Sequence, residues 1–305
     1  MLLSGNTGII TTMKLCSPVT FTTPDQYQLK GLWFNSGQSK TGFIVVHGLG
    51  SSVFSQHDSI LPLVDKETSA IFFNNRGHDT IGGVRKLTDN NDKGYETMDI
   101  GAAHEVFSDC VYDIQGAVNF LKDHDIQEIY LVGHSTGCQK SIYYLSQNQA
   151  DIKGVVLLAP VSDYAFALAN QKQADLMEAV EAASKLINEG RPHDLMPGNY
   201  SSSTIDAQRF LSLHDANSIE EIFSYSQPNK EPKILLKVNV PTLALIGEND
   251  QYADRPVGEI IDWFKNHTNA PLSARVIKGS MHNFLGYGDE VAGNIKSWML
   301  SLPKI

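Results

Sequence analysis

One serine, Ser135, stands between two glycines in the segment LVGHSTGCQ, residues 131–139. Gly133 and Gly137 complete the pattern G-x-S-x-G, which follows an apolar run at 129–132 and precedes a helical pattern. Glycines on both sides indicate a backbone bent so tightly that a Cβ would clash. A strand, a sharp turn and a helix are the context in which this pattern exposes a serine hydroxyl. We therefore predict that Ser135 is a nucleophile; the alternative is a tight turn with an incidental serine.

A serine hydroxyl needs a base that removes its proton during attack. Of the ten histidines, His282 follows the last apolar run, in the segment IKGSMHNF. The imidazole in turn needs a carboxylate that fixes its tautomer, and Asp250 follows the preceding run. Serine, aspartate and histidine then come in the order that is typical of such sites. The sequence predicts a triad of Ser135, Asp250 and His282, with Asp163, after an earlier run, as the alternative acid.

Negative charge on an attacked carbonyl oxygen requires two backbone N–H donors. We expect one from Thr136, which directly follows the nucleophile. The other is expected from Leu49 in the segment HGLG, because the glycines beside it allow the backbone to turn inward. His47 in that segment is predicted to brace the loop rather than to transfer a proton.

Other polar or reactive side chains near these motifs are interpreted as structural. Arg76 and His78, in NNRGHD, are predicted to support a turn, with contact to a substrate as the alternative. Cys138 is interpreted as a small buried residue against the sheet. Glu248 and Asp254 are interpreted as loop surface or as a helix cap.

The elements that must position these residues alternate along the chain. Short apolar runs are typical of strands buried on both faces, and amphipathic segments between them are typical of helices. This alternation predicts an α/β fold with a mostly parallel sheet, right-handed crossovers and helices on both faces. Residues 17–37 are predicted as a β-hairpin. The predicted buried strands are 43–46, 70–73, 128–133, 154–160, 241–247 and 273–279, and the predicted helices are 101–122, 139–148, 257–267 and 289–302.

The alternation stops in residues 163–232, where no buried strand is predicted and one long helix is expected over 164–190. The sequence therefore predicts a core of residues 1–162 and 233–305 and a mainly helical cap of residues 163–232. Because the cap leaves and re-enters next to the candidate triad, we expect it to arch over Ser135. Apolar cap residues are expected to form a substrate pocket, with Phe166 and Met177 as its binding residues and Leu168, Leu176 and Val180 beside them.

The composition of the chain argues against several classes of binding partner and cellular setting. The formal net charge of −10 argues against nucleic acid, which is bound by clustered Lys and Arg. The three cysteines, Cys16, Cys110 and Cys138, suit neither a disulfide framework nor a metal site. No basic segment followed by an apolar one begins the chain, where Met13 is an alternative start, and no run approaches the ~20 residues of a membrane span. We expect a cytoplasmic protein.

The segments VVHGLG, NNRGHD, VGHSTG, IGENDQ and GSMHNF resemble, in their order, the motifs of the α/β-hydrolase superfamily over residues 43–284. Within it, GHSTGCQ, APVSDY, AQRFLSL and EIFSYSQ resemble a serine-esterase subgroup that includes fungal siderophore esterases. The acid loop ENDQYAD and residues 162–200 depart from that subgroup. The resemblance implies hydrolysis of a small-molecule carboxylic ester by acyl transfer, without cofactor or metal.

The predicted function is therefore a serine hydrolase that cleaves a carboxylic ester through an acyl-enzyme intermediate. A thioesterase, an amidase or a carbon–carbon hydrolase on the same triad remains an alternative, because the fold does not define the substrate. A non-catalytic ligand-binding homologue is an alternative of another class, although this chain keeps a candidate for each triad residue. The zinc-ligand spacing H-E-x-x-H and the dinucleotide pattern G-x-G-x-x-G are absent from the sequence.

Overall fold

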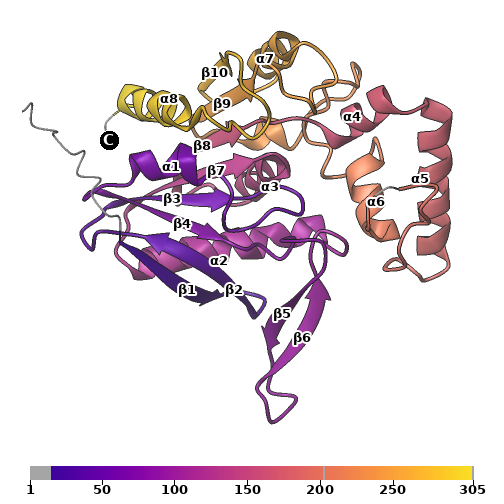
Figure 1. Ribbon diagram of the computed structural model, residues 1–305, viewed down its shortest axis with the longest axis horizontal. Coiled ribbons are helices and arrows are strands. Elements are labelled where there is room, and N and C mark those ends of the chain that lie inside the picture. The colour runs from indigo at the N-terminus through magenta and orange to yellow at the C-terminus, as the bar shows by residue number, and fades with distance from the viewer. Residues whose placement is uncertain (1–14, 202, 304–305) are drawn as a thin grey trace, which may run out of the picture.

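The computed structural model describes residues 15–201 and 203–303, so Met13 lies outside the described residues. In the described part of the chain, ten strands form one sheet in the order β10-β9-β8-β7-β3-β4-β2-β5-β6, with β1 paired to β2 (Figure 1). Their bounds are β1 Cys16–Thr22, β2 Tyr27–Phe34, β3 Thr41–Val46, β4 Thr68–Phe73, β5 Gly82–Leu87, β6 Tyr95–Ile100, β7 Glu128–His134, β8 Ile152–Leu158, β9 Thr242–Gly247 and β10 Leu272–Ile277.

The helices between and beside these strands are α1 His57–Ile60, α2 Cys110–Asp123, α3 Thr136–Leu145, α4 Asp163–Asn170, α5 Gln173–Asn188, α6 Ala207–His214, α7 Val257–Asn266 and α8 Gly288–Ser301. Short 3₁₀ turns are Leu61–Leu63, Phe107–Asp109 and Leu235–Lys237. No helix within residues 15–201 and 203–303 is both long and apolar enough to cross a membrane.

The six strands from β10 to β4 in the sheet order are parallel to one another, whereas β2 pairs antiparallel with β1, β4 and β5, and β5 pairs antiparallel with β6. Alternate residues of β3 enter opposite core layers: Ile44 and Val46 pack under α2, α3 and α7, and Phe43 and Val45 pack under α1 and α8. A strand that is buried on both faces has to be apolar throughout, which is the pattern that the sequence displays. The predicted α/β fold, with its largely parallel sheet and its first hairpin, is confirmed.

Three differences from the expected elements have physical causes. The helix expected over 101–122 begins only at Cys110, because residues 101–106 form turns. The hairpin β5–β6 was not predicted, since both strands are largely exposed and carry no continuous apolar run. The helix expected over 164–190 is two helices, because Gln171 and Lys172 are extended. α4 buries Ala165 against the body, while α5 packs against α6.

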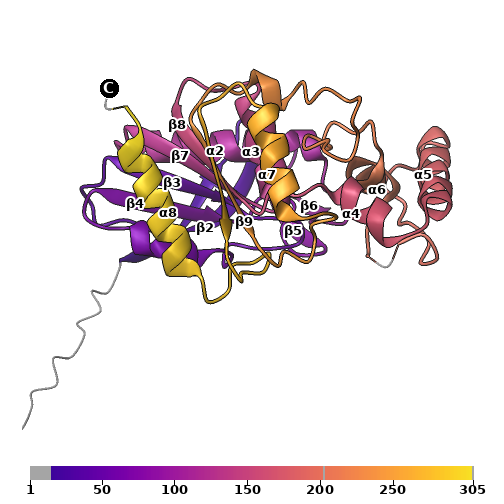
Figure 2. The same ribbon diagram turned by 90° about the horizontal axis from the view of Figure 1, so that it is seen from above.

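Helices α4, α5 and α6 lie together at one end of the molecule, with α5 outermost (Figures 1 and 2). Helices α5 and α6 share a small apolar cluster of their own, which consists of Ala179, Ala183, Met196, Ile205, Ala207, Phe210 and Leu213. A cluster of seven buried side chains, three of them alanine, buries little apolar area, so α5 and α6 depend on contacts with the body as well.

Buried charges provide such a contact. Glu105, in the loop after β6, pairs with Lys140 of α3 at 2.5 Å and with Arg209 of α6 at 3.1 Å, and Arg209 also pairs with Glu220. All four side chains are at most 3% exposed. Burial acts to raise the pKa of Glu105, but the charges of Lys140 and Arg209 outweigh it and hold that pKa below its usual range. The carboxylate therefore stays ionised and links the helix after Ser135 to α6.

Helix α3 lies so close to the sheet that neither Gly133 in β7 nor Gly137 in α3 has room for a Cβ. A Cβ on Gly133 would lie 2.3 Å from the carbonyl oxygen of Gly137, and one on Gly137 would lie 2.1 Å from that of Val46. Both obstacles are backbone atoms, which cannot move aside as a flexible side chain can. The two glycines are thus required by the approach of helix to sheet.

We expect Gly137→Ala to lower the free energy of unfolding by about 2 kcal/mol or more, because the added methyl forces α3 away from β3. Gly293→Ala is the matched control: this glycine is also helical, is exposed on α8 and has open space around its Cβ position. That change is expected to leave stability unchanged or to raise it by up to ~1 kcal/mol. Urea unfolding of both variants measures the difference, and equal losses would contradict the packing argument.

Candidate active site

Ser135 occupies the turn between β7 and α3 with φ 54° and ψ −127°. A positive φ is unfavourable for a residue with a Cβ and persists only where the surroundings enforce it. Here the Ser135 N–H donates to the carbonyl of Leu158 at 3.0 Å, and the Ser135 carbonyl accepts from the N–H of Cys138 at 2.8 Å. The strained turn lifts the side chain away from the sheet, which is the geometry expected of a nucleophile elbow.

His282 and Asp250 are brought together by neighbouring parallel strands. Asp250 follows β9 and His282 follows β10, so both lie at the carboxyl edge of the sheet. The Nδ1 of His282 lies 2.8 Å and 2.9 Å from the two carboxylate oxygens of Asp250. Both residues are 6% exposed. A proton on Nδ1 that is donated to this carboxylate leaves Nε2 free to accept a proton.

The backbone and ring of His282 are held by groups that the sequence did not single out. His134, the residue before Ser135, lies with its Nε2 at 3.1 Å from the carbonyl of His282. Burial, followed by the influence of His282, lowers the pKa of His134 to about 4. The neutral ring thus donates from Nε2. The Gln251 amide oxygen accepts from the His282 N–H at 3.3 Å, and the ring of Tyr252 packs edge-on at 4.7 Å between centroids.

Ser135 and His282 line one cavity of about 220 Å³. Leu49 and Phe166, both predicted site residues, line it as well. The other lining residues are Gly48, Ser51, His134, Val161, Ser162, Asp163 and Tyr252. Asp250 lies behind His282, and the N–H of Thr136 belongs to the first turn of α3, where intrahelical acceptors are lacking. The structure thus gathers six of the seven predicted site residues in one place.

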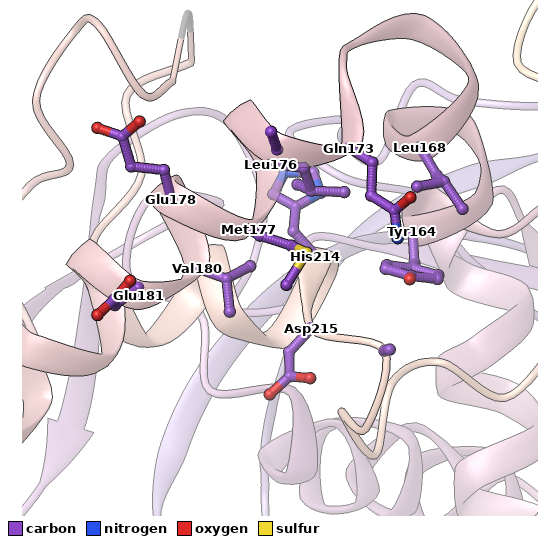
Figure 3. A pocket seen from close by; sticks show the side chains of 12 residues that line it. Tyr164, Leu168, Gln173, Leu176, Met177, Glu178, Val180, Glu181, His214 and Asp215 are labelled. Carbon is purple, nitrogen blue, oxygen red and sulfur yellow. The ribbon is translucent and has the colours of Figure 1, made fainter.

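Met177 is the exception and corrects our expectation for the cap. It lines a second, larger cavity of about 720 Å³ together with Leu168, Leu176 and Val180, and this cavity shares no lining residue with the first (Figure 3). The cause is the break after α4. Helix α5 starts in a new direction after the extended residues 171–172, and its Met177 is 63% exposed.

Among the described residues, Asp250 is the carboxylate that bonds the ring of His282. Asp163 lines the cavity from the first turn of α4 instead. Burial, and then the charge of Glu220, raise the pKa of Asp163 to about 7, against the opposing influence of Arg209 and His282. The other two acids considered from the sequence are engaged elsewhere: Glu248 accepts from the N–H of Gly279, and Asp254 pairs with Arg255.

The loop predicted to supply Leu49 is braced by His47. Its Nδ1 lies 2.8 Å from the carbonyl of Gly48, and its Nε2 accepts from the N–H of Asn75 at 3.2 Å. Burial, reinforced by the positive charge of Lys140, lowers the pKa of His47 to about 3. The ring is held at both nitrogens and positions the backbone of its loop. The bracing role predicted for His47 is confirmed.

The interpretation of Asp254 as loop surface or a helix cap is wrong, because its side chain is 7% exposed and Pro256 is the N-cap of α7. The interpretations of Arg76 and Cys138 agree with the contacts. Arg76 is 2% exposed and pairs with Asp25, Asp109 and Asp113, so it supports its turn and lines neither cavity. Cys138 is fully buried, and burial raises the pKa of its thiol well above the usual range. Tyr252 and His134 were missed by sequence reasoning, although each lies within two residues of a predicted triad member.

Known proteins are similar to this chain in sequence and in fold. The chain is 24% identical over 202 residues to a monoglyceride lipase homolog of Monkeypox virus, covering 63% of this chain and 70% of that protein. A carboxyl esterase from Bacillus coagulans matches 95% of this chain and 99% of its own, with a TM-score of 0.64 and 15% identity. An esterase from Pyrococcus furiosus matches 94% and 91%, with a TM-score of 0.57 and 18% identity.

The fold is therefore that of the α/β hydrolases. A family model described as "Protein of unknown function (DUF1749)" matches residues 101–301, and the chain belongs to that family. The matched residues begin after β6 and include Ser135, Asp250 and His282.

The raised pKa of Asp163 predicts a specific pH dependence of stability. Between the ordinary pKa of about 4 and the folded value of about 7, the folded protein retains a proton that the unfolded chain releases. Stability of the wild type therefore falls as pH rises through this range. Asp163→Asn removes that contribution, so its stability relative to wild type is expected to increase from pH 4 to pH 7 and then level off.

Urea unfolding of both proteins at closely spaced pH values measures this difference. Glu221, whose pKa burial also raises to about 7, contributes to both proteins, and the part of its contribution that does not depend on the charge of Asp163 cancels in the comparison. A difference that stays constant from pH 4 to pH 8 would contradict the proposed state of Asp163.

Proposed function

We propose that this protein is a serine hydrolase that cleaves carboxylic esters through an acyl-enzyme intermediate. The observation that carries the proposal is the cavity shared by Ser135 and His282, with Asp250 bonded to the far nitrogen of the same imidazole. A strained serine, an oriented imidazole and a buried carboxylate have the roles needed for nucleophilic catalysis. The names of the relatives, two esterases and a lipase homolog, support an ester as the substrate class.

In the proposed reaction, the Ser135 Oγ attacks the ester carbonyl while the His282 Nε2 takes its proton. Asp250 holds the Nδ1 proton and stabilises the imidazolium that forms. The backbone N–H groups of Leu49 and Thr136 stabilise the oxyanion. Collapse of the tetrahedral intermediate transfers a proton from His282 to the leaving alcohol and leaves acyl-Ser135. Water then attacks the acyl group by the same route and releases the acid.

The cavity favours a compact group beside the scissile bond. Its volume of about 220 Å³ lies below the ~300–1,000 Å³ that is common for drug-sized ligands. Phe166 and Tyr252 pack against each other at 5.3 Å and form an aromatic wall, while Asp163 places a carboxyl group at the same opening. We infer a short or compact acyl group on one side of the ester. A siderophore-type ester, suggested by the resemblance of the segment GHSTGCQ, belongs in the substrate screen.

The cap is proposed to be residues 163–232 on a core of residues 1–162 and 233–305. Helix α4 begins at the carboxyl edge of the sheet, directly after β8, and contributes Asp163 and Phe166 to the cavity of Ser135. In this proposal α4 selects the substrate, while α5 and α6 keep α4 in place. The chemistry belongs to the core.

We expect Ser135→Ala and Asp250→Asn to reduce kcat without unfolding the protein. The first removes the nucleophile and should cost a factor of about 10⁴ to 10⁶; the second leaves the wrong imidazole tautomer and should cost about 10⁴. Turnover of p-nitrophenyl acetate and labelling by a fluorophosphonate probe are the measurements. Asp254→Asn is the control, since this acid pairs with Arg255 and should leave kcat unchanged. Normal turnover by Ser135→Ala would end the serine-hydrolase proposal.

Phe166→Ala and Met177→Ala test independently which of the two cavities holds the substrate. The first enlarges the space beside Ser135 and is expected to raise kcat/KM for butyrate and hexanoate esters relative to acetate by about tenfold, as one or two kcal/mol of relieved crowding would give. The second changes the other cavity and is expected to leave the ratios unchanged. Probe labelling of Ser135 should persist in both. If Met177→Ala changed the chain-length ratios and Phe166→Ala did not, α5 and not α4 would border the substrate.

A further inference from the structure

We propose that His104, His193 and Asp206 form a binding site for one divalent transition-metal ion, with Zn²⁺ as the best-fitting ion, at the junction of body and cap. The site is separate from the Ser135 cavity and independent of the proposed hydrolysis. The three side chains each offer one ligand atom, and these atoms all lie within 4.8 Å of one another.

The Nδ1 atoms of both imidazoles lie beside the same carboxylate oxygen. The Nδ1 of His104 and the Nδ1 of His193 each lie 2.9 Å from Oδ2 of Asp206. Their rings lie 6.3 Å apart between centroids at an angle of 72°, so they approach that oxygen from different directions. Two nitrogens and one carboxylate oxygen that converge in this way give three of the four positions of a tetrahedral zinc site.

The carboxylate is fixed by the backbone and not by the histidines alone. Asp206 is fully buried, and its Oδ1 accepts from the N–H of Arg209 at 2.7 Å as the N-cap of α6. Its own N–H donates to the carbonyl of Ala103, the residue before His104, at 2.9 Å. The second oxygen is therefore held in place beside His104. A supporting hydrogen bond of this kind orients a ligand before the ion arrives.

The loop that carries His193 is braced in the same way. The N–H of Ala207 donates to the carbonyl of Asp194 at 3.0 Å, and the N–H of Gln208 donates to the carbonyl of Pro192 at 3.0 Å. These bonds join both neighbours of His193 to the start of α6. The side chain of His193 is 63% exposed, whereas that of His104 is 21% exposed. Solvent therefore reaches the site from the side of His193 and can supply the fourth ligand.

The donor set indicates the ion. Imidazole nitrogen suits zinc, copper, nickel and iron better than magnesium or calcium, which prefer a shell of oxygen atoms. Two histidines, one carboxylate and a water molecule are a common set for zinc. Binding requires that each Nδ1 presents a lone pair to the ion, which a neutral imidazole does when its proton is on Nε2.

The position of the site suggests what the ion does. His104 belongs to the body, in the loop between β6 and α2, while His193 and Asp206 flank the connection from α5 to α6 in the cap. An ion held by all three would join cap and body at one point. It lies beside Glu105, whose buried pair with Arg209 joins the same two parts. The metal would thus stabilise the folded cap without contacting the substrate.

The test uses the full-length protein without a histidine tag, dialysed against a chelator and then titrated with ZnSO₄ by calorimetry. We expect one Zn²⁺ per chain and a rise in melting temperature on addition of the ion. Co²⁺ in place of Zn²⁺ should give the visible absorption of a four-coordinate site. His193→Ala, at an exposed position, should fold normally and weaken Zn²⁺ binding on the order of 100-fold or more.

Three further proteins make the result decisive. His104→Ala should lose binding in the same way, and Asp206→Asn keeps an oxygen that can cap α6 while removing the charge. His124→Ala, an exposed histidine at the C-terminal end of α2, whereas His104 precedes the N-terminal end, should bind as wild type does. Failure of the wild-type protein to bind Zn²⁺, or equal binding by wild type and His193→Ala, would overturn the proposal. The binding data do not involve ester hydrolysis, so either proposal can fail alone.

Discussion

The close contact of α3 with the strands beneath it is the constraint on which the site depends. Gly133 and Gly137 let the helix begin directly against the backbone of β3, where any Cβ would overlap a carbonyl oxygen. That closeness forces the turn between β7 and α3 to be short, and the short turn forces Ser135 to a positive φ. The same approach brings Gly48 to the serine, since a Cβ there would lie 2.8 Å from that of Ser135. Strain at one residue is thus maintained by packing around it.

Charge buried between the body and α6 extends this constraint to residues 163–232, the proposed cap. Lys140 of α3 and Arg209 of α6 share one carboxylate, Glu105, and none of these groups reaches water. Removing one member of a buried ion pair leaves the others uncompensated, which is far more costly than losing an exposed pair. The helix that presents Ser135 and the helix that supports the cap are therefore joined through a single side chain. The neighbouring residues His104 and Asp206 add a second connection at the same junction.

The proposed function divides chemistry and recognition between different parts of the chain. The strained serine follows β7, which has a hydrogen-bonded neighbour on each side, and the paired imidazole follows the edge strand β10, which is bonded to β9. The wall opposite them comes from α4, which meets the rest of the cap at an extended pair of residues, Gln171 and Lys172. A second, larger cavity opens beyond that break, between α4, α5 and the end of α6 (Figure 3).

The sequence by itself determined the order of strands and helices in the core, because an apolar run between polar turns is a local signal. It also determined the positions of Ser135, Asp250 and His282, since each follows a buried strand and the carboxyl ends of parallel strands meet at one edge. Only the tertiary structure decided where α5 lies, because the helical periodicity continues through the break at residues 171–172. Likewise, only folding brought His104 next to His193 and Asp206, about a hundred residues further along the chain. Local sequence patterns show which residues are buried and how apolar residues are spaced along an element. Contacts between distant segments depend instead on how whole elements pack.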